Sequence, residues 1–134
     1  MKEITKLMTN KFKIMELGID FMGYKVEKES SLSFHHLVLQ KKNGGKDEMN
    51  NGAILVRNTS HDYLHIIEKA DRKYFEYITE QMMIENKQGF IDEKCLKTIN
   101  EILLEFEEKH SEDTFKKGNL ILQDIYLDRV MRNR

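Results

Sequence analysis

Two short apolar runs joined by a polar loop set the strictest limit on how this chain of 134 residues can fold. The first run covers residues 32–40, the second covers residues 52–57, and the stretch between them contains Gly44-Gly45. Runs of this length, bounded by turn-forming residues, are typical of strands. Because a single loop connects them, we expect them to pair as a β-hairpin. Residues 20–28 alternate loosely between apolar and polar side chains and predict a further short strand.

The remainder of the chain has the periodicity of amphipathic helices. Expected helices cover residues 3–16, ended by Gly18; a stretch from the capping residues Asn58, Thr59 and Ser60 to Gly89, with a break near Asp71; residues 92–109; and a stretch that begins near Asn119. Pro and Trp are absent and only one Cys is present, so the composition favours helices and excludes a disulfide framework within the chain. The expected fold class is α+β, in a single domain over residues 1–134.

The charge distribution differs between the two halves of the chain. The formal net charge is −1, which does not favour a nucleic-acid partner, because phosphate-binding proteins usually carry an excess of basic residues. Residues 1–60 hold 10 basic and 7 acidic side chains, whereas residues 61–134 hold 12 and 16. We therefore expect any anion-binding surface in the first half and an acidic helical support in the second.

Four of the five histidines fall within one window of 31 residues, as two pairs. His61 and His65 are four positions apart in a predicted helix, so their side chains leave one face of it a turn apart. This spacing allows two imidazoles to bind one metal ion. His35 and His36 lie in the first predicted strand, which the hairpin can bring over the start of that helix. Adjacent strand residues point to opposite faces, so both can serve one site only if the strand bends or ends there.

The segment that contains these histidines resembles the HNH nuclease motif of nuclease colicins and of small HNH proteins in phages and mobile elements. The shared features are paired histidines on a strand, a Gly-Gly loop, an Asn that opens a second strand, and a helix with H-x-x-x-H. The separations are 15 positions from His36 to Asn51, 10 from Asn51 to His61, and 4 from His61 to His65. These separations are similar to those of the family.

For the fold, the resemblance implies a ββα-metal (HNH, His-Me finger) core over residues 32–70, flanked by N- and C-terminal helices, with residues 71–134 as helical support. The chain departs from the family in two respects. Leu39 and Gln40 stand where many members carry a proline, and the Cys-x-x-Cys zinc knuckles of other members are absent. The flanking helices must then brace the core.

For the chemistry, the resemblance implies a hydrolytic site. His35, His61 and His65 would bind a metal ion, His36 would be the general base that activates water, and Asn51 would orient His36. Hydrolysis of a phosphodiester needs a base that exchanges protons near neutral pH and a cation that stabilises negative charge, and an imidazole and a metal ion supply these. The implied activity is that of a metal-dependent DNA endonuclease.

The implied cofactor is one divalent metal ion, Zn²⁺, Ni²⁺, Mn²⁺ or Mg²⁺. A ligand set made only of histidines binds Zn²⁺, Ni²⁺ or Co²⁺ more tightly than Mg²⁺, which prefers carboxylate oxygen. The implied partner is DNA. Phosphate contacts are expected from the basic side chains near the histidines, namely Lys41, Lys42, Lys46 and Arg57.

Several alternatives stay open at the level of sequence. Asn50 competes with Asn51 for the same role, His36 is alternatively a hydrogen-bonded core histidine, and loop lysines are commonly only solvated. The whole motif is alternatively an inactive HNH-like module, stabilised by metal, that binds a protein partner through its acidic helical half. The N-terminal residues lack the continuous apolar stretch of a signal peptide or membrane span, so we expect a soluble cytoplasmic protein without a membrane partner.

Overall fold

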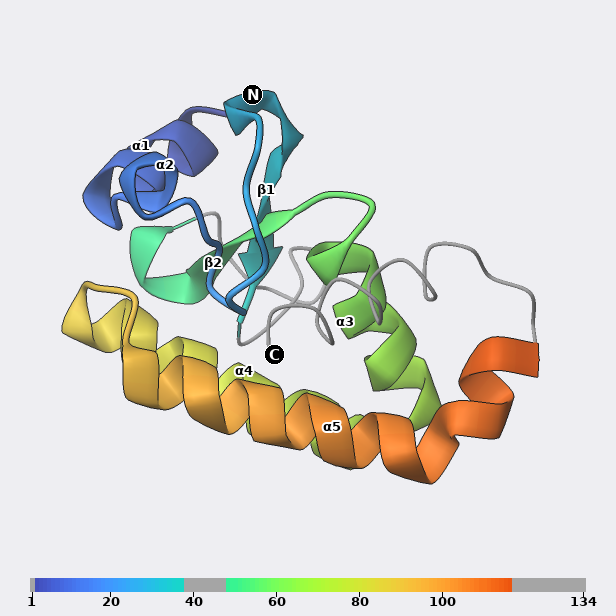
Figure 1. Ribbon diagram of the computed structural model, residues 1–134. Coiled ribbons are helices and arrows are strands. Elements are labelled where there is room, and N and C mark those ends of the chain that lie inside the picture. The colour runs from blue at the N-terminus through green and yellow to red at the C-terminus, as the bar shows by residue number, and fades with distance from the viewer. Residues whose placement is uncertain (1, 38–47, 117–134) are drawn as a thin grey trace.

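The computed structural model of the protein describes residues 2–37 and 48–116. Within these ranges the fold is mixed α+β, in agreement with the predicted class. The described elements are the helices α1 (Glu3–Lys11), α2 (Ile14–Leu17), α3 (Ser60–Ala70), α4 (Arg72–Gln88) and α5 (Glu93–Lys116), the strands β1 (Leu32–His36) and β2 (Gly52–Val56), and two short 3₁₀ helices, Glu29–Ser31 and Met49–Asn51. Figure 1 shows α1 and α2 on one side of the hairpin, with α3, α4 and α5 on the other.

The predicted hairpin is confirmed. β1 and β2 pair antiparallel, in a register that runs from Leu32 opposite Val56 to His36 opposite Gly52. Every residue of β2 is buried, because α1, α3 and α4 all contact this strand. The hairpin is therefore the centre of the core, although residues 38–40 of the first predicted strand lie outside the described residues.

Gly52 is required by the ring that lies across it. A Cβ atom at this position would lie 2.1–2.9 Å from three ring carbons of Phe34. We expect Gly52→Ala to displace this ring and to lower the free energy of unfolding by about 1–3 kcal/mol, as overpacking usually does. Urea denaturation measures the effect. The same substitution should cost less in a Phe34→Leu background, and an equal cost in both backgrounds would show that the ring is not the cause.

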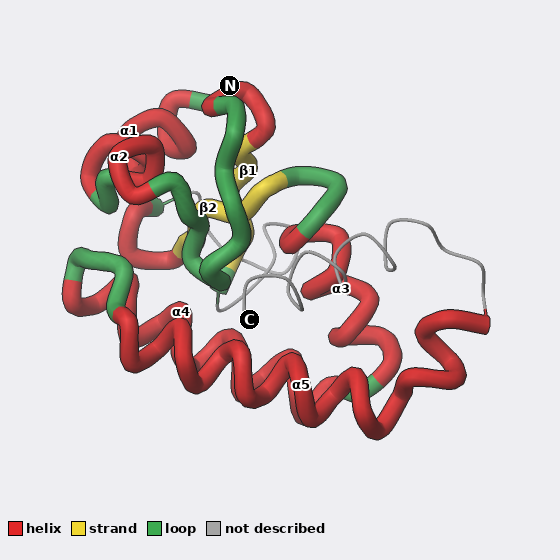
Figure 2. Tube along the Cα trace, in the orientation of Figure 1, coloured by secondary structure: helices red, strands yellow, loops and turns green. Residues whose placement is uncertain are grey.

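The predicted break near Asp71 is also confirmed. Asp71 has an extended backbone with φ −159°, and it separates α3 from α4. Gly89 ends α4 with φ 86°, a conformation that glycine adopts without strain. α4 packs along both α3 and α5, and Figure 2 shows α4 and α5 beneath the hairpin, with α3 beside it. The helix expected from Asn119 lies outside the described residues.

The predicted single helix over residues 3–16 is wrong in one respect, since it is broken into α1 and α2. Lys13, between the two, has a left-handed backbone with φ 56°. α1 closes just before it, because the N–H of Lys13 donates to the carbonyl of Asn10 instead of continuing the α-helical pattern. Gly18, with φ 71°, then ends α2 as predicted.

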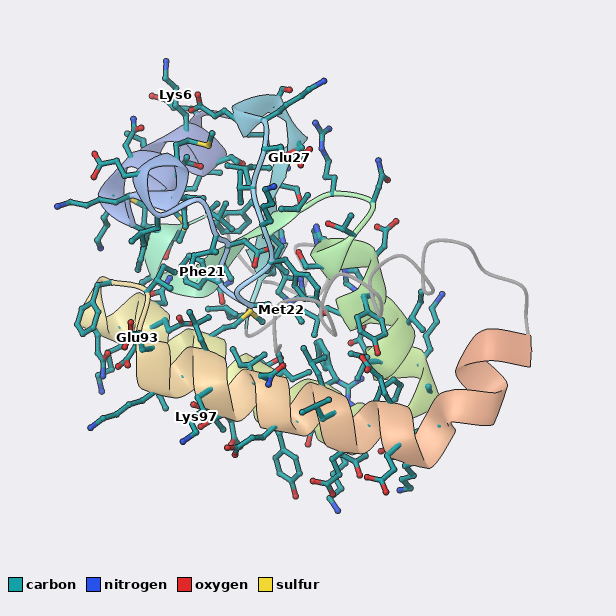
Figure 3. All side chains as sticks on the ribbon, viewed as in Figure 1. Lys6, Phe21, Met22, Glu27, Glu93 and Lys97 are labelled. Atoms are coloured by element: carbon teal, nitrogen blue, oxygen red, sulfur yellow. The ribbon has the colours of Figure 1, made fainter. Side chains whose placement is uncertain are left out.

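The predicted strand over residues 20–28 is wrong. Asp20 Oδ1 accepts hydrogen bonds from the backbone N–H groups of Met22 and Tyr24, both at 2.9 Å, which fold the chain into a turn. The strand pairing of this segment is limited to an isolated bridge between Lys25 and Ile19, the residue just before it. Figure 3 shows Phe21 and Met22 between the N-terminal helices and α5, and both are buried. The apolar residues of this segment therefore form part of the core from a turn.

Candidate metal centre

Three histidines from β1 and α3 meet beside the hairpin. His35 of β1 is 4% exposed, and His61 and His65 of α3 are partly buried. The ring centroids lie 5.1 Å apart for His35 and His61, 5.3 Å for His35 and His65, and 5.0 Å for His61 and His65. One possible ligand atom from each side chain lies within 4.8 Å of the other two. The structure therefore brings together the three residues that the sequence predicts as metal ligands.

A buried hydrogen-bond network fixes where α3 begins relative to β2. Asp20 Oδ2 accepts from the N–H of Val56, the last residue of β2, at 3.2 Å and from Oγ of Ser60, the first residue of α3. Burial raises the pKa of Asp20, although these hydrogen bonds oppose the shift. Asp20 thus holds the strand end and the helix start together, and His61 follows Ser60 directly. This role has no signal in the sequence, because Asp20 is 40 positions from Ser60.

The histidine cluster disfavours positive charge. Burial, followed by repulsion from His61, His65 and His36, lowers the pKa of His35 well below the usual value of 6.5. Burial, followed by repulsion from His65, lowers the pKa of His61 to about 4. Both rings are therefore neutral at pH 7. Neutral imidazole is the form that binds a metal ion.

Two residues that were not predicted hydrogen-bond to the ring nitrogens of the helix histidines. Ser33 Oγ lies 2.6 Å from His61 Nδ1, and Glu68 Oε1 lies 3.2 Å from His65 Nδ1. Glu68 stands three positions after His65 on α3, a helical spacing at which side chains meet, so the sequence could have indicated it. Ser33 is 28 positions from His61, and only the hairpin brings them together.

His36 is the last residue of β1, where it pairs with Gly52. Its half-buried ring packs edge-on against Phe34, with the centroids 5.0 Å apart. Phe34 and His36 share a face of the strand, and His35 points to the other, towards α3. The strand ends at His36, so His35 and His36 can serve one site although they point to opposite faces of a regular strand. The charge of His36 contributes to the lowered pKa of both His35 and His61.

The two candidate asparagines lie in the 3₁₀ helix before β2. Asn51 is half-buried, and its carbonyl accepts from the N–H of Leu37 at 3.1 Å, one residue beyond His36. Asn50 is exposed. Asn86 of α4 also fixes this segment, since its Nδ2 donates to the carbonyls of Met49 and Gly52 at 2.7 and 2.6 Å. Of the two candidates, Asn51 therefore has the position closer to His36 along the hairpin.

The predicted phosphate-binding residues are only partly within the described chain. Lys41, Lys42 and Lys46 lie outside the described residues. Arg57 is exposed, and its guanidinium donates to the carbonyl of Ser30. It follows Val56, which pairs with Leu32 at one end of the hairpin, whereas His36 lies at the other end. The structure therefore does not bring Arg57 to the end of the strand where His36 lies.

The histidine geometry fits a metal ion. Two nitrogens bound to a tetrahedral metal at 2.0–2.1 Å lie about 3.3–3.4 Å apart, and His35 Nδ1 lies 3.3 Å from His61 Nε2. Nδ1 is thus the nitrogen of His35 that faces the cluster, whereas Nε2 is buried and has no hydrogen-bond partner within residues 2–37 and 48–116. Three imidazoles suit Zn²⁺ or Ni²⁺, and they leave a tetrahedral ion one open position.

None of the described helices combines the length and the apolar character needed to cross a membrane. No protein-family model, curated protein or solved structure matches this chain.

Proposed function

We propose that this protein is a metal-dependent HNH-type endonuclease that hydrolyses DNA phosphodiester bonds, with a ββα-metal core formed by β1, β2 and α3. One observation carries the proposal: His35 from the strand meets His61 and His65 from the helix, and His36 stands at the end of the same strand. The HNH motif has these residue types in this chain order. The sequence resemblance and the juxtaposition in space therefore support the same function.

His35, His61 and His65 would hold one divalent metal ion in this mechanism. When bound, such an ion would supply Lewis-acid stabilisation of the negative charge on the phosphoryl and leaving oxygens. The lowered pKa values of His35 and His61 keep both rings uncharged at neutral pH, so each has one nitrogen with a free lone pair for a metal ion. Burial of His35 limits its movement and prepares the site for the ion.

His36 would take a proton from the attacking water. Imidazole is the side chain that changes its protonation state most readily near neutral pH. Phe34 packs against one side of the His36 ring. The carbonyl of Asn51 accepts a hydrogen bond from the N–H of Leu37, the residue after His36. We propose that these contacts orient His36 towards the water. By the family resemblance, the products carry a 5′ phosphate and a 3′ hydroxyl.

Plasmid cleavage tests this function directly. We expect the purified protein to cut supercoiled plasmid DNA when supplied with at least one of Mg²⁺, Mn²⁺, Ni²⁺ and Zn²⁺, and EDTA to stop the reaction. The double variant His61→Ala, His65→Ala removes two of three ligands, so it should lose both cleavage and calorimetric binding of Zn²⁺ or Ni²⁺. His110→Ala is the matched control, because His110 is bonded to Asp71 and lies outside the cluster.

Two outcomes would count against the proposal. Unchanged metal binding in the double variant would reject the metal site itself. Metal binding by the wild type without cleavage under any of the four metals would favour an inactive metal-stabilised binding module, a function with which the net charge of −1 agrees.

A further inference from the structure

The hydroxyl of Ser33 lies between two groups that together decide its role. Ser33 Oγ is 3.2 Å from the carbonyl oxygen of Leu55, its partner across the hairpin, and 2.6 Å from His61 Nδ1. A carbonyl oxygen can only accept a hydrogen bond, and a hydroxyl has one proton to donate. Ser33 therefore donates to Leu55 and accepts from His61. Nδ1 of His61 carries the proton, and Nε2 is left with a free lone pair.

Glu68 has the same effect on His65. Its Oε1 lies 3.2 Å from His65 Nδ1, and its Oε2 lies 3.6 Å from Arg72 Nη1. A carboxylate held by an arginine is an acceptor, so Nδ1 of His65 donates to it. The lone pair of His65 is then on Nε2. Glu68 differs from Ser33 in its negative charge, which makes the imidazole that it binds a stronger metal ligand.

We infer that Ser33 and Glu68 are positioning residues that fix the tautomers of His61 and His65, so that each ring presents an unprotonated Nε2 to the metal opposite Nδ1 of His35. Their role towards a metal rests on the proposed function, whereas the tautomers are properties of the protein alone. In the opposite tautomer, a proton on His61 Nε2 would occupy the direction in which His35 Nδ1 lies 3.3 Å away. His61 could then bind the ion only after that proton had moved to Nδ1. In the inferred tautomer only His35, which donates from Nδ1 to His61 Nε2 in the metal-free protein, has to give up the proton of this contact.

Two independent measurements test this inference. In protein labelled with ¹⁵N in its histidine rings, two-dimensional NMR correlation at pH 7.5 without metal should show Nδ1 protonated and Nε2 unprotonated in both His61 and His65. Ser33→Ala should remove this preference in His61 alone, and Glu68→Ala in His65 alone. By calorimetry, each variant should bind Zn²⁺ about 10–100-fold more weakly, the usual effect of removing a partner of a metal-binding histidine.

Matched variants separate this role from general loss of structure. Ser33→Thr keeps a hydroxyl and should restore both the tautomer and the affinity. Ser30→Ala removes an exposed serine three positions away and should change neither. Glu76→Ala removes the other acidic partner of Arg72, whose Nε lies 3.4 Å from Glu76 Oε1, and should leave His65 unchanged.

The outcomes distinguish the inference from the proposed function. Nε2 protonated in wild-type His61 or His65 would overturn the inference, as would Ser33→Ala and Glu68→Ala variants with unchanged tautomers. Failure of the wild type to bind Zn²⁺ would instead reject the metal site, and with it the roles of Ser33 and Glu68 towards a metal. Weaker binding in both variants with rescue by Ser33→Thr would support the inference in full.

Discussion

Replacing His36 with Ala is expected to remove plasmid cleavage almost completely while the affinity for metal stays close to that of the wild type. The proposed general base is not a ligand, because His35 points to α3 from the opposite face of the same strand. A positioned general base contributes about 10²–10⁴-fold to the rate. Cleavage rates with the most active metal, together with calorimetric titration of that metal, measure both quantities.

His35→Ala provides the comparison, because the two substitutions remove the same side chain from adjacent positions of β1. It should lower both the metal affinity and the cleavage rate, since His35 supplies a ligand atom to the cluster. Circular dichroism checks that both variants keep the fold. Cleavage that survives in His36→Ala would reject His36 as the base, and loss of metal binding in that variant would assign it to the ligand set instead.

The sequence predicted the local features of the fold better than those made by distant residues. The hairpin followed from two short apolar runs, and the break at Asp71 followed from helical periodicity, because both are properties of consecutive residues. The turn at residues 20–28 was missed although its hydrogen bonds from Met22 and Tyr24 to Asp20 are local, because the apolar alternation there resembles a strand. The bond of the same carboxylate to Ser60 could not be predicted. A pairing over 40 positions has no local signal.

The same limit applies to the candidate metal centre. His61 and His65 could be paired by their helical spacing, and the predicted hairpin could bring His35 and His36 near them, but only the resemblance to a family selected His35 as the ligand. The contact of Ser33 with His61 depends on the register of the hairpin and on the residue at which α3 begins. Neither can be predicted from the residues next to Ser33 or His61 in the sequence. Periodicity therefore finds candidate ligands, whereas the residues that orient them require the three-dimensional structure.

Alkaline pH is expected to destabilise the protein through Glu85 of α4. Glu85 is fully buried, and its Oε1 has no hydrogen-bond partner among the described residues. Burial raises the pKa of this carboxyl to about 9, and the negative charges of Asp20 and Asp92 add to the shift, although the N–H of Asp92 donates to Oε2 and opposes it. The folded protein thus keeps a proton at pH 7 that the unfolded chain, with the ordinary value of 4.5, has lost.

This difference sets the sign of the pH dependence. Stability that Glu85 confers is fully present below pH 4.5 and is lost as the pH rises towards about 9, by about 1.4 kcal/mol for each pH unit. Asp20, whose pKa is also raised, contributes in the same direction. His35 and His61 act oppositely and in another range, because their lowered pKa values remove stability only as the pH falls below 6.5. Between pH 7 and 9 the pH dependence of the unfolding free energy therefore reports on the buried acids and not on these two histidines.

Over that interval, the metal-free wild type should lose about 2 kcal/mol of unfolding free energy through Glu85 alone, as measured by urea denaturation in EDTA. Glu85→Gln keeps an oxygen that accepts from the N–H of Asp92 but cannot ionise, so its stability should fall much less and should exceed that of the wild type at pH 9. Glu80→Gln, at an exposed position of the same helix, should follow the wild type. Parallel curves for the wild type and Glu85→Gln would show that Glu85 is already ionised in the folded protein at pH 7, and burial would then not be the force that controls its proton.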